Sequence, residues 1–270
     1  MLVGLYANPD RDPDFVYRQQ LTQLFADKGV QVLTDPAKFG SADLVISLGG
    51  DGTFLTLAHL DTVIDKPCIG VNLGSVGFLT EIEPQDLAQA VDQICQGQYE
   101  IDERMMLSMQ VLDDQGQLLQ KREALNDVAM MRLAGGRIVT VDFWINSHPV
   151  ERIPGDGLII STSTGSTAYS LAAGGPIVHP DMDVIIITPI CPHTLHNRSY
   201  LAPGDATIEL RLSEDSSAAM VSADGKQSIK IEQGMIKIQK SRRTFKILRL
   251  GGDRFYQVLP QKIQERGMLR

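Results

Sequence analysis

The stretch Leu48-Gly49-Gly50-Asp51-Gly52-Thr53-Phe54-Leu55 joins a strand-like segment to a helix-like one. The apolar run 44–48 predicts a buried strand, and residues 54–58 predict the start of a helix. Three glycines within four positions leave no Cβ atoms between the backbone and a ligand. Backbone N–H groups at such a strand-to-helix turn bind phosphate well. The stretch therefore predicts a phosphate-binding loop, with a tight turn capped by aspartate as the alternative.

Asp51 is unusual in such a loop because a carboxylate repels phosphate. Two tasks would explain its presence. It could hold a metal ion, or it could accept the proton of a hydroxyl group that is about to be phosphorylated.

The first hundred residues alternate between strand and helix patterns. Strands are predicted at 2–7, 30–33, 43–48 and 68–71, and helices around 15–25 and 87–95. This alternation indicates a parallel sheet covered by helices, in which ligands bind at the carboxyl ends of the strands. A second glycine loop, Asn72–Gly77, follows the fourth strand. Both glycine loops are thus expected at the ligand-binding edge of the sheet.

The pattern changes near Ile101, after which short strands and turns predict a mostly antiparallel β domain. Asp113–Gly116 is a hairpin signal, and Lys240–Arg243 is interpreted as a solvated turn. The strand 245–250 and a helix containing Pro260 close the chain. The domains expected are residues 1–100, residues 101–240, and a C-terminal segment, 241–270, that packs on the first.

Two polar segments interrupt the β half. The segment 155–169 passes from a strand into a turn rich in hydroxyl groups, which suits ribose, phosphate or carboxamide groups. A capped helix is the alternative interpretation. Asn126-Asp127 lies within an apolar run, where a buried polar pair needs partners. This pair could bind an adenine edge or ribose hydroxyls, and a β-bulge or turn is the alternative.

Composition limits the classes of partner. The net charge of -8 and the lack of a dense basic run argue against nucleic acid and anionic membranes. Three widely spaced cysteines suggest neither a disulfide framework nor a zinc site. No apolar run reaches membrane-spanning length. A cytoplasmic protein without a protein-held metal ion is therefore expected.

Together these motifs resemble the NAD kinase family. Gly49–Thr53, Asn72–Thr80, Asn126-Asp127, Asp156–Leu158 and Thr164–Ser170 match the family's motifs in the family's order, over nearly the whole chain. The resemblance implies an N-terminal parallel α/β domain and a second, β-sandwich-like domain, with the C-terminal segment returning to the first. It also implies transfer of the γ-phosphoryl group of ATP, or of polyphosphate, to the adenosine ribose 2′-hydroxyl of NAD, which yields NADP.

The resemblance assigns roles by position. Asp51 matches the proton acceptor, and the phosphates are assigned to Gly49, Gly50, Gly52 and Thr53. The NAD-binding positions are Asp51, Gly52, Asn126, Asp127, Arg137, Asp156, Thr167, Ala168, Tyr169, Ala172 and Lys226. Magnesium or another divalent cation is expected to arrive with ATP, and a homodimer or homotetramer is implied.

Two positions depart from the family pattern. Pro154 stands where many members have arginine, so a cationic contact is missing or replaced, and Ala172 stands where many have serine. Two other classes share some of the motifs. A lipid or sugar kinase would share the first loop, and a non-catalytic NAD(P)-sensing module would keep the binding motifs.

Overall fold

The computed structural model describes residues 1–74, 77–195, 197–252 and 255–268. The chain divides into two compact units, one formed by Met1–Glu103 with Phe245–Arg270 and the other by Arg104–Thr244. Ser75 and Val76 of the second glycine loop lie outside the described residues.

The first unit is built on a parallel sheet in the order β2-β1-β3-β4. Its strands are β1 (Leu2–Ala7), β2 (Gln31–Leu33), β3 (Leu44–Gly49) and β4 (Cys68–Asn72). The C-terminal end of β16 (Met235–Arg249) adds a parallel neighbour to β4, with Ile247 opposite Cys68. The C-terminal segment thus returns to the first unit.

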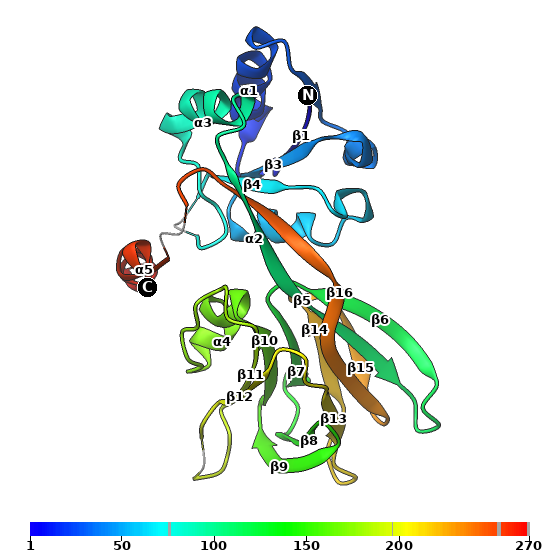
Figure 1. The fold of residues 1–270 in the computed structure, drawn as a ribbon. Helices are drawn as coiled ribbons and strands as arrows, with labels where there is room; N and C mark the ends of the chain where they lie inside the picture. Colours follow the sequence, from blue (N-terminus) through cyan, green and yellow to red (C-terminus); the bar gives the residue numbers. More distant parts are fainter. Residues whose placement is uncertain (75–76, 196, 253–254, 269–270) are drawn as a thin grey trace. The chain divides into compact units, whose positions relative to one another are not determined.

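Helices cover both faces of this sheet (Figure 1). They are α1 (Val16–Asp27), α2 (Asp51–Leu57) and α3 (Leu87–Cys95), and a further helix, α5 (Phe255–Met268), follows β16. Figure 1 shows α1 and α3 on one face and α2 on the other. In α3, Leu87, Val91 and Ile94 are buried at helical spacing, and together with Leu21 and Phe25 of α1 they belong to the core cluster of the sheet.

The second unit consists of antiparallel strands in two groups. One is a six-stranded sheet in the order β12-β11-β10-β7-β14-β15. Its strands are β7 (Asp127–Arg132), β10 (Gly157–Thr162), β11 (Val184–Ile190), β12 (Tyr200–Pro203), β14 (Ala219–Ala223) and β15 (Lys226–Ile231). The other group contains β5 (Glu100–Leu112), β6 (Leu118–Ala124), β8 (Val139–Ile145), β9 (His148–Gly155), β13 (Ile208–Leu212) and the first part of β16. The short helix α4 (Tyr169–Ala172) follows β10.

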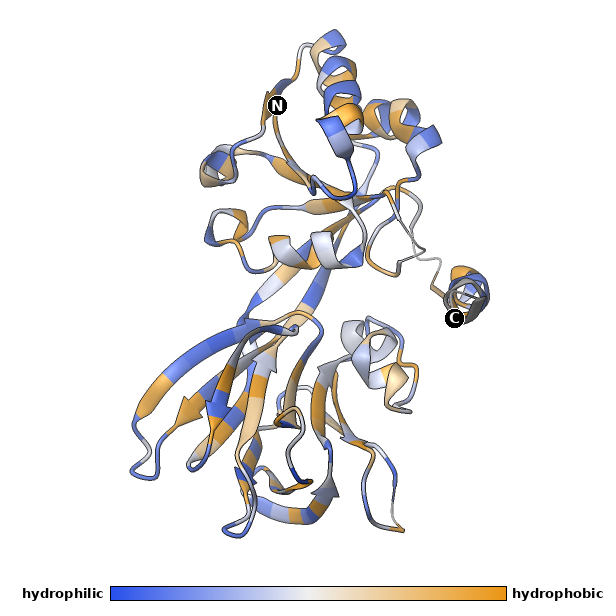
Figure 2. Ribbon diagram, turned by 180° about the vertical axis from the view of Figure 1, so that it is seen from behind, coloured by the Kyte–Doolittle hydropathy of each residue, from blue (hydrophilic) through white to orange (hydrophobic). Residues whose placement is uncertain are grey.

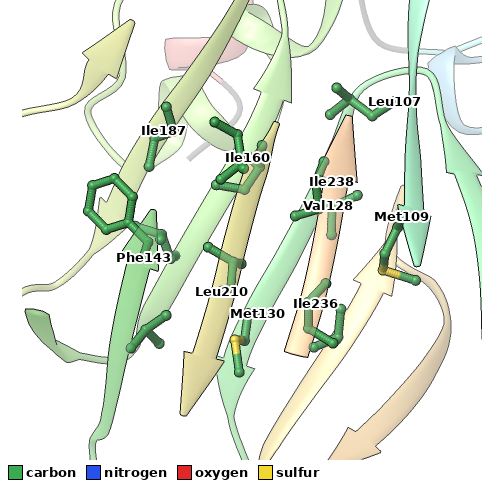
Figure 3. Close-up of a cluster of buried hydrophobic side chains, with 14 of the residues drawn as sticks. Leu107, Met109, Val128, Met130, Phe143, Ile160, Ile187, Leu210, Ile236 and Ile238 are labelled. Carbon is green, nitrogen blue, oxygen red and sulfur yellow. The ribbon is translucent and has the colours of Figure 1, made fainter. Parts of the chain in front are cut away.

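One hydrophobic core joins these two groups of strands. Figure 3 shows its side chains, which come from β5, β7, β8, β10, β11, β13 and β16. Hydrophobic and hydrophilic residues alternate along many of these strands (Figure 2), as expected when one face of a sheet is buried. The predicted fold class, a parallel α/β part with a β-sandwich-like part and a returning C-terminal segment, is confirmed.

The interpretation of Lys240–Arg243 as a solvated turn is wrong, because these residues lie inside β16. Ser241 Oγ donates to Glu123 Oε1 at 2.8 Å, and Arg243 Nη1 lies 3.1 Å from Glu123 Oε2. The carboxylate of the neighbouring strand thus provides partners for a polar stretch that would otherwise favour solvent.

The strands β9 and β12 are among those that the sequence did not predict. Each lies at the end of its strand order, and each contains proline, at positions 149, 154 and 203. Proline is tolerated at sheet edges but weakens a sequence-based strand prediction.

Candidate functional site

The first glycine loop connects the end of β3 to α2. A Cβ atom on Gly49 would lie 2.2 Å from Thr53 Oγ1, so only glycine fits there. A Cβ atom on Gly50 or Gly52 would meet no heavy atom within 4 Å. The backbone at these two positions therefore has open space beside it, as a ligand-binding loop requires.

The Asp51 carboxylate lies against the backbone of residues 78–80, which directly follow the second glycine loop. Oδ2 accepts the N–H of Phe78 at 2.9 Å, while Oδ1 accepts those of Leu79 at 3.0 Å and Thr80 at 3.4 Å. A Cβ atom on Gly77 would lie 1.9 Å from Asp51 Oδ1. Asp51 thus ties the two loops together, and glycine at position 77 makes this approach possible.

The turn after β1 reaches the same edge of the sheet. Asn8 Nδ2 donates to Thr53 Oγ1 at 3.2 Å, and Asn8 N donates to Leu48 O at 3.0 Å. The nearest atom to a Cβ placed on Gly74 would be Arg11 Nη1, at 3.4 Å. Three loops at the carboxyl ends of β1, β3 and β4 therefore meet, and they include a cation that the sequence did not single out.

In the second unit, Asn126 and Asp127 stand at the start of β7. Asn126 O accepts the backbone N–H of Thr162 at 2.9 Å. A Cβ atom on Gly165 would lie 2.1 Å from Asn126 O, so glycine allows the hydroxyl-rich segment to pack closely here. The structure thus brings together two motifs that are 35 or more residues apart in the sequence.

Asp127 is 6% exposed and carries a perturbed carboxyl group. Burial raises its pKa to about 7, and the negative charge of Asp224 adds to the shift. A carboxyl group that titrates near neutral pH in a ligand-binding segment is a functional candidate.

This pKa has a consequence for stability. Between about pH 4 and about pH 7 the folded chain keeps a proton that the unfolded chain has released, so the free energy of unfolding falls as the pH rises through this window. Asp127→Asn removes the penalty. We expect the variant to be more stable than the wild type by on the order of 1–4 kcal/mol at about pH 8, with no such gain at about pH 4.

Urea unfolding at the two pH values measures this difference. Asp113→Asn is the matched control, because Asp113 accepts N–H groups in an outlying hairpin turn. An equal change at both pH values in Asp127→Asn would show that ionisation of Asp127 does not oppose folding.

Asp156 follows β9 and is paired with a cation from a neighbouring strand. Arg132 Nε lies 2.5 Å from Asp156 Oδ1, and Arg132 Nη1 donates to Gly136 O at 3.1 Å. The two side chains are 35% and 34% exposed. A guanidinium group therefore lies beside Asp156 although Pro154 lacks one.

Tyr169 belongs to the same neighbourhood. Its hydroxyl group donates to Met131 Sδ at 3.3 Å. Burial raises the pKa of Tyr169, and the nearby charges of Asp127, Cys191 and Asp156 add to the shift. The structure thus places Tyr169 close to two predicted dinucleotide contacts.

The remaining predicted positions differ in exposure. Thr167 is 5% exposed, whereas Ala172 at the end of α4 is exposed. Ala168 lies between the 3-10 turn 164–167 and α4. Lys226 begins β15, where burial lowers its pKa and Asp224 opposes the change. Arg137 lies on an exposed loop between β7 and β8, where its carbonyl oxygen accepts the Ser217 hydroxyl group at 3.5 Å.

A cleft of about 890 Å³ lies elsewhere in the second unit. It is lined by hairpin residues such as Asp113 and Glu214 and by Trp144, and by none of the predicted site residues. Among the described residues, no group of three or more His, Cys, Asp and Glu side chains could hold a metal ion. None of the described helices is long and apolar enough to cross a membrane.

Sequence reasoning missed several contributors to these sites. Phe78–Thr80 belong to the motif Asn72–Thr80, but they contact Asp51 through backbone N–H groups. Residue type does not reveal such contacts. Arg132 comes from a strand whose pattern is otherwise apolar. Asp224-Gly225 has the residue types of a hairpin turn, and an aspartate in such a turn can also fold its side chain back onto the backbone.

Family profiles and relatives match this chain over most of its length. The profiles of the ATP-NAD kinase N-terminal domain and the ATP-NAD kinase C-terminal domain match residues 26–99 and 125–250. A protein named NAD kinase from Acetivibrio thermocellus is 40% identical over 98% of this chain and 98% of its own length. One from Caldanaerobacter subterraneus subsp. tengcongensis is 41% identical over 98% of this chain and 99% of its own.

Solved structures give the same result. An NAD kinase from Archaeoglobus fulgidus in complex with ATP has a TM-score of 0.80 and 25% identity, covering 98% of this chain and 99% of that one. Yeast NADH kinase complexed with NADH has a TM-score of 0.82 and 20% identity, covering 97% of this chain and 86% of that one. The second likeness concerns the fold alone.

Proposed function

The chain belongs to the NAD kinase family, and on this basis we propose how its residues phosphorylate NAD. NAD kinase activity is the function of this chain, and neither a lipid or sugar kinase nor a non-catalytic sensing module has support among its relatives. The observation that carries the proposed mechanism is the position of the Asp51 carboxylate between the two glycine loops.

Asp51 accepts the proton of the adenosine ribose 2′-hydroxyl group of NAD. As the proton leaves, the 2′-oxygen forms a bond to the γ-phosphorus of ATP, the bond from that phosphorus to the bridging oxygen breaks, and ADP departs. Because phosphoryl transfer has a loose transition state, most of the acceleration comes from positioning and electrostatics. The N–H groups of Phe78 and Leu79 hold the carboxylate in place for this task.

The phosphoryl donor is bound at the first glycine loop. Gly50 and Gly52, with open space at their Cα atoms, let phosphates approach the backbone, and Gly49 with Thr53 fixes the turn. Arg11, beside Gly74, supplies a positive charge at the same edge. Magnesium or another divalent cation arrives with ATP and is held mainly by phosphate oxygens, where it neutralises their charge. Polyphosphate is a second donor that the same loop would accept.

Residues of the second unit hold the dinucleotide. Asn126 and Asp127 bind adenine and ribose hydroxyls, for which the ionised Asp127 carboxylate is an acceptor. Asp156 contacts the nicotinamide side. The other contacts lie along the bound dinucleotide, and they come from Thr167, Ala168, Tyr169, Ala172, Lys226 and Arg137.

Three properties of the whole molecule complete the proposal. The chain acts as a homodimer or homotetramer in the cytoplasm, in NADP biosynthesis. The division of the chain into two compact units supports an N-terminal domain completed by the C-terminal segment and a separate β-rich dinucleotide-binding domain.

The test is incubation of the purified chain with NAD and Mg-ATP, coupled to a dehydrogenase specific for NADP. Parallel reactions replace ATP with polyphosphate and NAD with NADH, the latter followed by chromatography. NADP formation is expected with ATP, and its absence under every combination would overturn the proposal.

Pro154→Arg should tighten NAD binding. Position 154 lies in β9, two residues before Asp156, and proline offers no cation there. The added guanidinium group is expected to lower the dissociation constant by the equivalent of about 0.5–3 kcal/mol, a range that covers hydrogen bonds from ordinary to charge-assisted ones. Titration calorimetry with NAD gives the change directly.

Pro149→Arg, at the other end of the same strand, is the control for the added charge. Equal affinities of wild type and Pro154→Arg would show either that another residue, such as Arg132 at 2.5 Å from Asp156, already supplies the cation or that the site lies elsewhere.

A further inference from the structure

Asp224 lies in the turn between β14 and β15, outside the groups of residues assigned above. Its φ is +52° and that of Gly225 is +67°, so both residues adopt the left-handed region typical of a two-residue hairpin turn. In this conformation the Asp224 side chain folds back toward the segment that precedes β7.

The Asp224 carboxylate accepts three successive backbone N–H groups of that segment. Oδ2 accepts the N–H of Leu125 at 2.9 Å, and Oδ1 accepts those of Asn126 at 2.8 Å and Asp127 at 3.1 Å. The N–H of Asp224 in turn donates to Asp127 O at 2.8 Å. Successive N–H groups that converge on an anion form a nest, and here the anion belongs to the chain itself.

The carbonyl side of the same segment is held as well. Thr162 Oγ1 donates to Leu125 O at 2.7 Å, and Thr162 N donates to Asn126 O at 2.9 Å. With both its N–H and its C=O groups engaged, the backbone at 125–127 has one conformation. The directions of the Cα–Cβ bonds of Asn126 and Asp127 follow from it.

We infer that Asp224 is a positioning residue for NAD binding, which aims Asn126 and Asp127 at the dinucleotide through their backbone. The inference rests on the proposed function of these two residues. Asp224 acts on the backbone of residues 125–127 and does not contact the substrate.

The charge of Asp224 gives the inference a second consequence. Asp224 and Tyr169 of α4 interact electrostatically with Asp127, and Lys226 of β15 interacts with Asp224. Removing the Asp224 charge leaves burial as the main influence on the Asp127 carboxyl group. NAD binding should then tolerate more acidic conditions, because Asp127 ionises at lower pH.

The test compares the purified full-length wild type with Asp224→Asn, Asp224→Glu and the control Asp113→Asn. Asparagine offers one acceptor oxygen in place of two, and its amide group faces N–H donors. We expect the KM for NAD of Asp224→Asn to rise roughly tenfold, the loss of hydrogen bonds to a charged group. Its kcat and its KM for ATP should change much less. Asp113→Asn loses a turn carboxylate far from the segment and should match the wild type.

The pH dependence of kcat/KM for NAD reports the pKa values of groups in the free enzyme. It therefore separates an effect of the Asp224 charge on Asp127 from a general loss of packing. Its acid limb should move to lower pH in Asp224→Asn. In Asp224→Glu the limb should stay in place, since the charge remains, while the KM still rises. Should Asp224→Asn fail to fold, a wild-type KM for NAD in Asp224→Glu would overturn the inference.

A wild-type KM and pH profile in Asp224→Asn would overturn the inference, as would a raised KM with an unmoved acid limb in that variant. A wild-type chain that forms no NADP at all would refute the proposed function instead. The two failures are therefore distinguishable.

Discussion

Asp51→Asn is expected to lower kcat by about 10²–10⁴-fold, the usual contribution of general-base assistance. The ribose 2′-hydroxyl group is a poor nucleophile, and its proton must leave as the O–P bond forms. The amide retains the size of the carboxylate but cannot take the proton. NAD binding should be largely retained, and loss of a negative charge near the phosphates should favour ATP.

The structure adds a second effect of this substitution. The N–H groups of Phe78, Leu79 and Thr80, directly after the second glycine loop, point at the Asp51 carboxylate, and an amide can accept at only one of its two positions. A modest fall in the thermal midpoint is therefore expected, with the fold intact. Coupled assays, calorimetry with NAD and thermal unfolding distinguish the two effects. A near-wild-type kcat would rule out Asp51 as the base, and complete loss of folding would indicate that the loop is only a structural turn.

Gly77→Ala should lower kcat by on the order of 10²-fold, because misplacing a reacting group by about 1 Å can cost that much. The new Cβ atom would lie 1.9 Å from Asp51 Oδ1, so the carboxylate or the second loop must move. Either movement breaks the bonds from Phe78 and Leu79 that hold the base.

Gly40→Ala is the matched control in the same unit, since its Cβ atom would meet nothing closer than Thr62 O at 3.9 Å. Its kcat should equal that of the wild type. If Gly77→Ala also retained full activity, the contact between the two loops would have no part in catalysis.

Much of the first unit can be predicted from the sequence. Its strands are apolar runs bounded by turns, and the predicted strand at 2–7 coincides with β1. The helix α3 follows from buried residues at helical spacing. In the second unit the hairpin signal at Asp113–Gly116 is confirmed, because β5 and β6 pair on either side of it. Gly116 has a φ of +79°, which favours glycine.

The rest depends on tertiary contacts that residue type does not encode. The polar run at Lys240–Arg243 continues a strand because Glu123 lies on a neighbouring strand. Asp51 and Asp224 each accept three N–H groups from loops distant in sequence, and only the fold reveals which loops those are. The raised pKa of Asp127 likewise arises from burial and from a carboxylate 97 residues away.

The most direct test of the proposed phosphoryl transfer to NAD is the position of the phosphate in the product. NAD and Mg-ATP are incubated with the purified chain, and the product is isolated and examined by phosphorus and proton NMR. We expect one new phosphate monoester on the adenosine ribose 2′-oxygen, formed with one ADP per product. A phosphate on any other oxygen, or release of ADP without a phosphorylated dinucleotide, would contradict it.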